Sequence, residues 1–156
     1  LGMLEVKNNY YLIADEYGTP ELKISNLLRA FSNCPQKLGE GYTEVELGLF
    51  TDEPQLSFLD FYLKQGEKLI IGGIRNYPIL NLDMATSIQE ELKASMQETN
   101  AKQAILIVPS IVSTEIQDYL KQYNIIVWDI EDIQALEETR NNLIKETTPI
   151  QQLAHA

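Results

Sequence analysis

The sequence predicts an α/β domain with a mixed central sheet flanked by helices, and three observations lead to this prediction. Two short apolar runs around one turn, within residues 56–76, indicate a hairpin. A strongly periodic segment after it indicates a helix, and residues 104–128 indicate a strand–helix–strand unit. A hairpin makes an antiparallel pair, whereas a strand–helix–strand unit makes a parallel pair with a right-handed crossover. The sheet should therefore contain both kinds of pairing.

Length and composition favour one globular domain. The chain has 156 residues, of which 44% are hydrophobic and 22% charged, as in ordinary globular proteins. We expect a single domain over residues 1–149, followed by a loose tail or linker to a further domain at 150–156. The apolar runs are strand-sized, so no membrane is expected, and a lone Cys34 fits a reducing cytoplasm.

The charge of the chain bears on its partners. Twelve basic residues stand against 23 acidic ones, a net charge of −11, which should repel a nucleic acid backbone. Bound divalent cations could offset that charge locally. Either the basic surface belongs to another domain or subunit, through which nucleic acid is contacted, or the domain does not touch nucleic acid. A protein partner or a homo-oligomer is expected in both cases.

The first third of the chain predicts a strand, a helix and a second strand. Residues 6–15 read as a strand that ends in a turn. Thr19 is a good N-cap, and Pro20 suits the first helical position because its missing N–H costs nothing there. This helix should run to about Cys34. Residues 42–50 alternate polar and apolar side chains, which predicts a strand with one buried face.

The hairpin follows, and a well-defined helix follows the hairpin. Gly66 supplies the turn, because glycine enters positive φ without steric cost, and Asp60 lies inside the first strand. Asp83 or Thr86 is the expected cap of the next helix. Its buried stripe is spaced by four residues and consists of Met84, Ile88, Leu92 and Met96.

The last third predicts the strand–helix–strand unit and a closing helix. Residues 104–108 form a continuous apolar run of strand length, which predicts a strand buried on both faces. Ser113 or Thr114 should cap the short helix that follows. Residues 125–128 read as another buried strand, and a long amphipathic helix begins shortly after Asp129.

Most catalytic signatures are missing from the sequence. His155 is the only histidine and falls in the expected tail, so a catalytic triad and a histidine-rich zinc site are improbable. The glycines at 72–73 lack the spacing of a phosphate-binding loop. Carboxylate chemistry with a hard cation is what is left, for which one or two carboxylates, water and substrate phosphate would suffice with magnesium.

The order of elements and two segments of the hairpin carry a resemblance to a known family. The segments are Leu59-Asp60-Phe61-Tyr62-Leu63 and Lys68-Leu69-Ile70-Ile71-Gly72-Gly73-Ile74-Arg75-Asn76. With the helix and the βαβ unit that follow, they resemble the PD-(D/E)xK nuclease superfamily, in particular its Mrr-type restriction endonuclease-like domains. The resemblance covers roughly residues 20–136 and implies a three-layer restriction endonuclease-like fold. It also implies DNA cleavage with a metal ion, held by an aspartate and an acidic-x-lysine triplet.

Carried over residue by residue, the motif is degenerate. Asp60 matches the aspartate, and Glu21 matches a glutamate sometimes found on the leading helix. Gly73 and Arg75 fall at the ends of the acidic-x-lysine triplet. Gly73 offers no metal ligand, and an arginine does not give up its proton near neutral pH as a lysine can. Arg75 could instead pair with Asp60, a guanidinium in place of the metal.

The lost ligand could have moved to another glutamate. The next helix carries Glu90 and Glu91, and a structural shift could bring in Glu67. The site residues expected from the resemblance are therefore Asp60 and Glu90 for a metal, with Arg75 and Glu21 completing the catalytic set.

Three functions stay open at this point. The leading hypothesis is a nuclease-derived domain with a degraded metal site and no cofactor, acting as a recognition or assembly module of a larger cytoplasmic protein. The second is an active Mg²⁺-dependent DNA endonuclease that uses Asp60 with a relocated glutamate. The third is a small-molecule-sensing α/β domain, whose pocket would lie at the loop after Val108 and the carboxyl ends of the buried strands.

Overall fold

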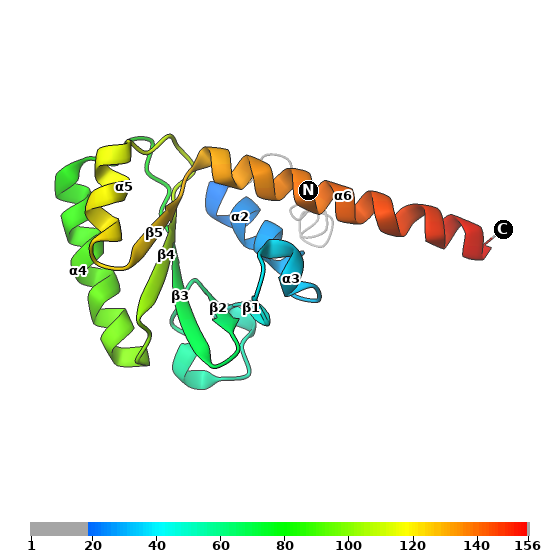
Figure 1. Cartoon of the computed structure of the whole chain (residues 1–156), viewed down its shortest axis with the longest axis horizontal. Coiled ribbons are helices and arrows are strands. Elements are labelled where there is room, and N and C mark those ends of the chain that lie inside the picture. The colour runs from blue at the N-terminus through cyan, green and yellow to red at the C-terminus, as the bar shows by residue number, and fades with distance from the viewer. Residues whose placement is uncertain (1–18, 156) are drawn as a thin grey trace, which may run out of the picture.

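The structure, a computed structural model, describes residues 19–155 and is an α/β fold with a five-stranded mixed sheet (Figure 1). The strands are β1 (Glu44–Leu47), β2 (Phe61–Gln65), β3 (Lys68–Ile74), β4 (Gln103–Ile107) and β5 (Ile125–Trp128). The helices are α2 (Pro20–Arg29), α3 (Pro35–Leu38), α4 (Leu82–Thr99), α5 (Thr114–Lys121) and α6 (Ile130–His155), and short 3₁₀ helices form η1 (Gly48–Phe50) and η2 (Pro54–Leu56). The predicted strand at 6–15 lies outside the described residues.

Both kinds of pairing occur in the sheet, as the sequence predicted. The strands lie in the order β1-β2-β3-β4-β5. β1 pairs with β2 and β2 with β3 in antiparallel register, while β3 with β4 and β4 with β5 are parallel. Gly66 turns the β2–β3 hairpin at a φ of +64°, a conformation that favours glycine.

Helices cover both faces of the sheet, so the fold has three layers. Helices α4 and α5 pack on one face, and α2, α3 and α6 lie on the other (Figure 1). Each face has its own apolar core. Ile71, Leu92 and Leu106 belong to the core under α4 and α5, whereas Phe31 and Phe61 belong to the other. The described helices include none that is both long and apolar enough to cross a bilayer.

Two of the predicted helix caps are confirmed, and one is wrong. The Thr19 hydroxyl accepts the Leu22 N–H at 3.2 Å, and Ser113 caps α5. Helix α4 starts earlier than expected, so its cap is Asn81 and not Asp83 or Thr86. The Asn81 side chain accepts the Met84 N–H at 2.9 Å from an extended backbone, the usual N-cap geometry.

The second predicted buried strand, β5, lies at one edge of the sheet. Its Ile126 side chain is 38% exposed, while its neighbours Ile125 and Val127 are buried against α5. Helix α6 follows directly and continues past Pro149 to His155, through the segment expected to be a tail.

Candidate functional site

Asp60 lies one residue before β2, at the mouth of the hairpin. Its Oδ2 atom accepts a hydrogen bond from the backbone N–H of Ile74, at the end of β3, over 2.8 Å. The ladder between the two strands begins at Phe61, which pairs with Gly72. The carboxylate therefore continues the hairpin where the backbone pairing has stopped, and the Asp60 position is fixed by the fold.

Arg75 follows β3 directly and brings a guanidinium to the same place. Its backbone N–H donates to the Ile107 carbonyl at 3.0 Å, so the chain still runs alongside β4 here. Nη1 donates to Asp60 Oδ2 and to the backbone carbonyl of the preceding residue, Ile74, each at 3.0 Å. Nη2 donates to Glu91 Oε1 on α4. The guanidinium is thus held between a carboxylate of the hairpin and a carboxylate of the following helix.

Both helix glutamates are exposed, and Glu91 is the one that contacts Arg75. Glu91 precedes Leu92, whose side chain packs over β3 and directs this turn of α4 toward the hairpin mouth. The contact of Glu91 with Arg75 links α4 to the site. The expected metal ligand was Glu90, whereas the glutamate that reaches Arg75 is its neighbour Glu91.

The remaining expected carboxylates lie elsewhere. Glu21 is in the first turn of α2, which covers the sheet face opposite α4. Glu67 is in the hairpin turn, seven residues from Ile74 along β3, or about 23 Å at the usual rise of a strand. Neither is brought to Asp60 together with Glu91.

Gly73 points toward the cluster formed by Asp60, Arg75 and Glu91. A Cβ built at Gly73 would meet Leu92 Cδ2 at 3.5 Å and Arg75 Nη1 at 3.6 Å, which are ordinary contacts. A side chain at position 73 would therefore start from the sheet face that carries the guanidinium. A side chain at position 73 would point in the direction that a metal-binding acid needs, but glycine has no side chain.

The electrostatics of the cluster favour a bound guanidinium. Arg75 has 24% of its side chain exposed and faces two carboxylates that are more exposed. Charge-assisted hydrogen bonds of this kind are stronger than neutral ones, although solvent screens pairs at a surface. Among residues 19–145, whose side chains the structure describes, no three His, Cys, Asp or Glu side chains gather so as to hold a metal ion.

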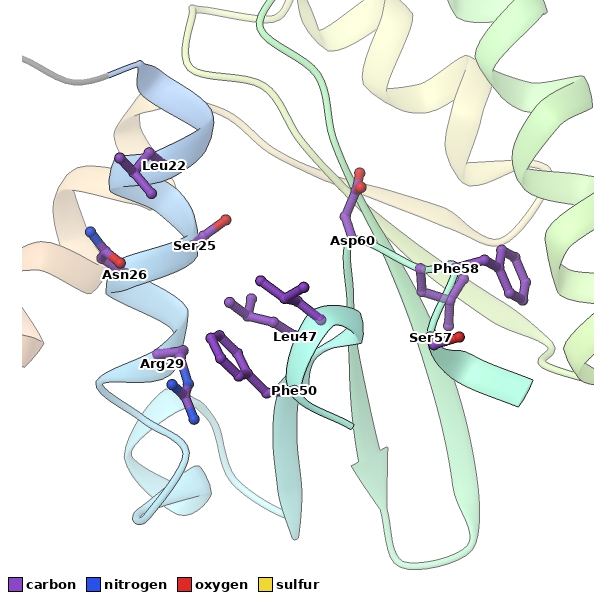
Figure 2. Close-up of a pocket in the computed structure, with 11 residues that line it drawn as sticks. Leu22, Ser25, Asn26, Arg29, Leu47, Phe50, Ser57, Phe58 and Asp60 are labelled. Carbon is purple, nitrogen blue, oxygen red and sulfur yellow. The ribbon is translucent and has the colours of Figure 1, made fainter. Parts of the chain in front are cut away.

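Next to Asp60 lies a pocket of about 590 Å³ that the sequence did not indicate (Figure 2). Its wall comes from one face of α2, from η1 and from the segment before β2. The residues that line it are Leu22, Ser25, Asn26, Arg29, Leu47, Leu49, Phe50, Ser57, Phe58, Leu59 and Asp60. Three of these are large apolar side chains left exposed, and Leu49 is the most exposed at 82%.

The polar members of this pocket are partly engaged. The Arg29 guanidinium lies 3.8 Å from the centre of the Phe50 ring, and its Nε is 3.6 Å from Glu46 Oε1. Ser57 donates to a nearby carbonyl. Figure 2 shows Ser25 directed from α2 toward the space between the helix and Leu47. The pocket therefore has a mixed lining of six apolar and five polar residues, and small-molecule sites commonly combine apolar walls with some polar groups.

A lysine on β2 belongs to a separate network. Lys64 Nζ lies 2.6 Å from Glu53 Oε2 and 3.6 Å from Glu44 Oε2, and the hydrogen bond with Glu53 raises the pKa of Lys64. Burial raises the pKa of Tyr62, whose hydroxyl lies 2.9 Å from Thr51 Oγ1. Lys64 is four residues along β2 from the hairpin mouth, about 13 Å at the rise of a strand, so it does not serve Asp60.

Comparisons with protein-family models, with curated proteins and with solved structures each give no match for this chain.

Proposed function

We propose that this chain is a nuclease-derived domain of the PD-(D/E)xK, restriction endonuclease-like type, in which an arginine has taken the place of the metal ion. In this proposal the domain does not cleave DNA. It acts as a recognition or assembly module of a larger cytoplasmic protein. The observation that carries the proposal is the guanidinium of Arg75 between the carboxylates of Asp60 and Glu91.

A guanidinium at this point supplies charge but no catalysis. A catalytic Mg²⁺ ion activates a bound water, polarises the phosphate and stabilises the leaving oxygen. Arg75 binds no water as a ligand and keeps its proton at neutral pH. It can neutralise the charge of Asp60 and Glu91, which is a structural task. Gly73 supplies no side-chain oxygen at the second ligand position.

The charge of the chain supports the same conclusion. A net charge of −11 opposes the approach of a nucleic acid backbone unless bound cations offset it. With an arginine in the place of the ion, that offset is limited to one positive charge. A protein partner need not carry the uniform negative charge of a nucleic acid backbone.

Mn²⁺ binding and plasmid cleavage test this proposal. We expect the unaltered protein to show no Mn²⁺ bound near Asp60 by electron paramagnetic resonance and no cleavage of supercoiled plasmid. The double variant Gly73→Glu/Arg75→Lys restores the motif in a place with room for a side chain, and it should bind Mn²⁺. The same double variant with Asp60→Ala is the matched control and should bind none. Cleavage by the unaltered protein that Asp60→Ala abolishes would disprove the proposal.

That last result would support the alternative, an active Mg²⁺-dependent DNA endonuclease. In that case Asp60 would share the ion with Glu91, the glutamate that faces the hairpin mouth, and Arg75 would have to swing away. Glu91→Gln would then abolish cleavage, while Glu90→Gln, on the exposed neighbour, would leave it unchanged.

The pocket beside Asp60 favours a second candidate function, a small-molecule-binding domain. The pocket was expected at the loop after Val108, but there the Asp129 carboxylate accepts the Val112 N–H at 3.5 Å and holds the loop against α6. The volume and apolar wall of the pocket between α2 and η1 suit a drug-sized ligand. A fragment library screened by ligand-observed NMR should give binders of the unaltered protein. The Ser25→Trp variant, whose larger side chain fills the pocket, should no longer bind them. Binders equally retained by Ser25→Trp would count against this site.

A further inference from the structure

The outer edge of β5 carries backbone groups without a partner strand. β5 is the last strand in the sheet order. The carbonyls of Asn124 and Trp128 accept hydrogen bonds from Ala104 and Val108 of the β4 segment, at 3.0 and 2.9 Å. Alternate residues of a parallel strand face the same neighbour. Ile125 and Val127 therefore direct their N–H and C=O groups away from β4, and no other strand of residues 19–155 pairs with them.

The two edges of the sheet differ in how they are protected. Natural edge strands commonly carry charges or proline, which discourage pairing with another chain. β1 at the other edge carries Glu44 and Glu46 on its four residues. β5 has the sequence Ile-Ile-Val-Trp, without a charge or a proline, and leaves Ile126 38% exposed. Within the part of the chain that the structure describes, the β5 edge is therefore the one open to pairing.

We propose that β5 pairs with β5 of a second copy of this chain, antiparallel about a twofold axis, to form one continuous ten-stranded sheet. The proposal rests on the assembly role proposed above and names its partner. Two extended strands have the same spacing of unpaired backbone N–H and C=O groups, so each can hydrogen-bond the groups of the other. A helix or a loop does not have this spacing.

One register satisfies all of the free groups. If Ile126 lies opposite the partner's Ile126, then Ile125 lies opposite the partner's Val127. Residues with outward-facing groups exchange both backbone bonds in an antiparallel pair, so this register makes four hydrogen bonds between the copies. It also places the two exposed Ile126 side chains next to each other on the same face, as in a close antiparallel pair.

The charges beside the strand match this symmetry. Gln117, Asp118 and Lys121 of α5 line a groove of about 230 Å³ along the edge with Ile125, Ile126 and Val127. A twofold axis sets the two α5 helices antiparallel on the same face of the sheet. In the proposed dimer, Asp118 of each copy lies across the axis from the partner's Lys121. This exchange of opposite charges favours a second copy over an unrelated strand, and it opposes the repulsion between two chains of charge −11.

Sedimentation velocity of the full chain over a concentration series tests the dimer. We expect a species of twice 17.8 kDa. Val127→Pro removes an outward N–H that β4 does not use, and Ile126→Lys puts a charge on the edge. Each should weaken dimerisation about tenfold or more. Circular dichroism with urea unfolding identifies any variant that has lost its fold, and only variants that keep it are scored.

A charge exchange makes the test specific for self-pairing. Asp118→Lys and Lys121→Asp should each weaken the dimer, and the double variant Asp118→Lys/Lys121→Asp should recover it. A chain that stays monomeric at all concentrations, or a dimer unaffected by Ile126→Lys and Val127→Pro, would overturn the proposal. Failure here leaves the Mn²⁺ and cleavage results untouched, because β5 lies three strands from β2. The two proposals can therefore fail separately.

Discussion

Asp60 and Arg75, fifteen residues apart, are joined by a hydrogen bond of 3.0 Å between Oδ2 and Nη1. The same oxygen accepts the Ile74 N–H. One carboxylate oxygen thus closes the hairpin mouth and orients the guanidinium toward Glu91. Asp60 therefore has a structural role, and its contribution to stability can be measured.

Asp60→Ala should lower the free energy of unfolding by about 2 kcal/mol, because it leaves the Ile74 N–H without its acceptor and removes one of the three acceptors of the Arg75 guanidinium. Asp60→Asn keeps an oxygen for the Ile74 N–H, so it should cost about half as much. Urea unfolding followed by circular dichroism measures both. The control is Asp52→Ala, an exposed aspartate away from the hairpin mouth, which should change little. Equal stability of Asp60→Ala and Asp52→Ala would show that the hydrogen bonds at Asp60 contribute nothing.

A double-mutant cycle isolates the pair itself. Asp60→Ala and Arg75→Ala together should cost less than the sum of the single variants, with a coupling free energy of about 1 kcal/mol. The cycle for Glu91 and Arg75 should give a smaller coupling, since Glu91 is the more exposed carboxylate. A coupling near zero for both pairs would mean that the guanidinium is not held as the structure describes.

Adjacent glycines of β3 should respond in opposite ways to alanine. A Cβ at Gly72 would lie 2.3 Å from the fully buried Phe61 ring, whereas a Cβ at Gly73 meets nothing closer than 3.5 Å. Gly72→Ala should therefore cost about 2 to 3 kcal/mol through overpacking. Gly73→Ala should be neutral or stabilise by up to about 1 kcal/mol, because alanine restricts the unfolded chain. The midpoint of thermal unfolding distinguishes them, and similar losses for both variants would contradict the packing described around β3.

The same glycines show what could be predicted from the sequence. The runs of β-branched and aliphatic residues gave the strands, since burial on both faces leaves a continuous apolar pattern. Local chemistry gave the Thr19 and Ser113 caps, because a cap is a contact between near neighbours in the chain. In the apolar pattern of the strand, Gly72 and Gly73 cannot be told apart. Only the Phe61 ring, eleven residues earlier and across the hairpin, makes them different.

The candidate site was predictable only in part for a related reason. Asp60 and Arg75 are set by the hairpin register, so their pairing could be anticipated once the hairpin was found. The choice between Glu90 and Glu91 depends on the rotation of α4, a shift of one residue, which the spacing of its apolar side chains leaves open. The pocket beside Asp60 exists because the chain turns into η1 after Leu47, where alternation predicted more strand. Its walls come from three separate segments, and no local pattern indicates such a pocket.

Asp129 should be the most important carboxylate for the stability of the closing helix. It is 5% exposed, and its side chain accepts the N–H of Glu131 at 3.0 Å, and of Asp132 and Val112 at 3.5 Å. Asp129→Ala leaves these donors near the start of α6 without a partner and should cost about 2 to 3 kcal/mol. Asp129→Asn keeps one acceptor oxygen and should cost less. Urea unfolding gives both values, with Glu138→Ala, an exposed carboxylate further along α6, as the control.

Stability should also fall at alkaline pH through Lys64 and Tyr62. The hydrogen bond with Glu53 raises the pKa of Lys64 above its ordinary 10.5, and burial raises that of Tyr62 above 10.0. Above pH 10 the folded state therefore holds protons that the unfolded state has released. The slope of the unfolding free energy against pH is proportional to the number of protons bound by the unfolded state minus the number bound by the folded state. This difference is negative here, so the free energy of unfolding decreases as the pH rises. Both contributions are complete below pH 10 and are lost as the pH passes through the folded-state values.

Two variants separate these contributions. Lys64→Met keeps the aliphatic stem and removes the charge, so its stability should decline less steeply above pH 10 than that of the unaltered protein. Tyr62→Phe removes the second titrating group, and it should also lose the bond to Thr51 at every pH. Urea midpoints at pH 8, 9, 10 and 11 give the slopes, and Lys68→Met, an exposed lysine on β3, is the control. Lys64→Met and Lys68→Met could instead flatten the decline in stability equally. In that case the ion pair of Lys64 with Glu53 could not be the cause of the decline. The contacts of Lys64 on the β1–β2 surface would then have no measurable effect on proton binding.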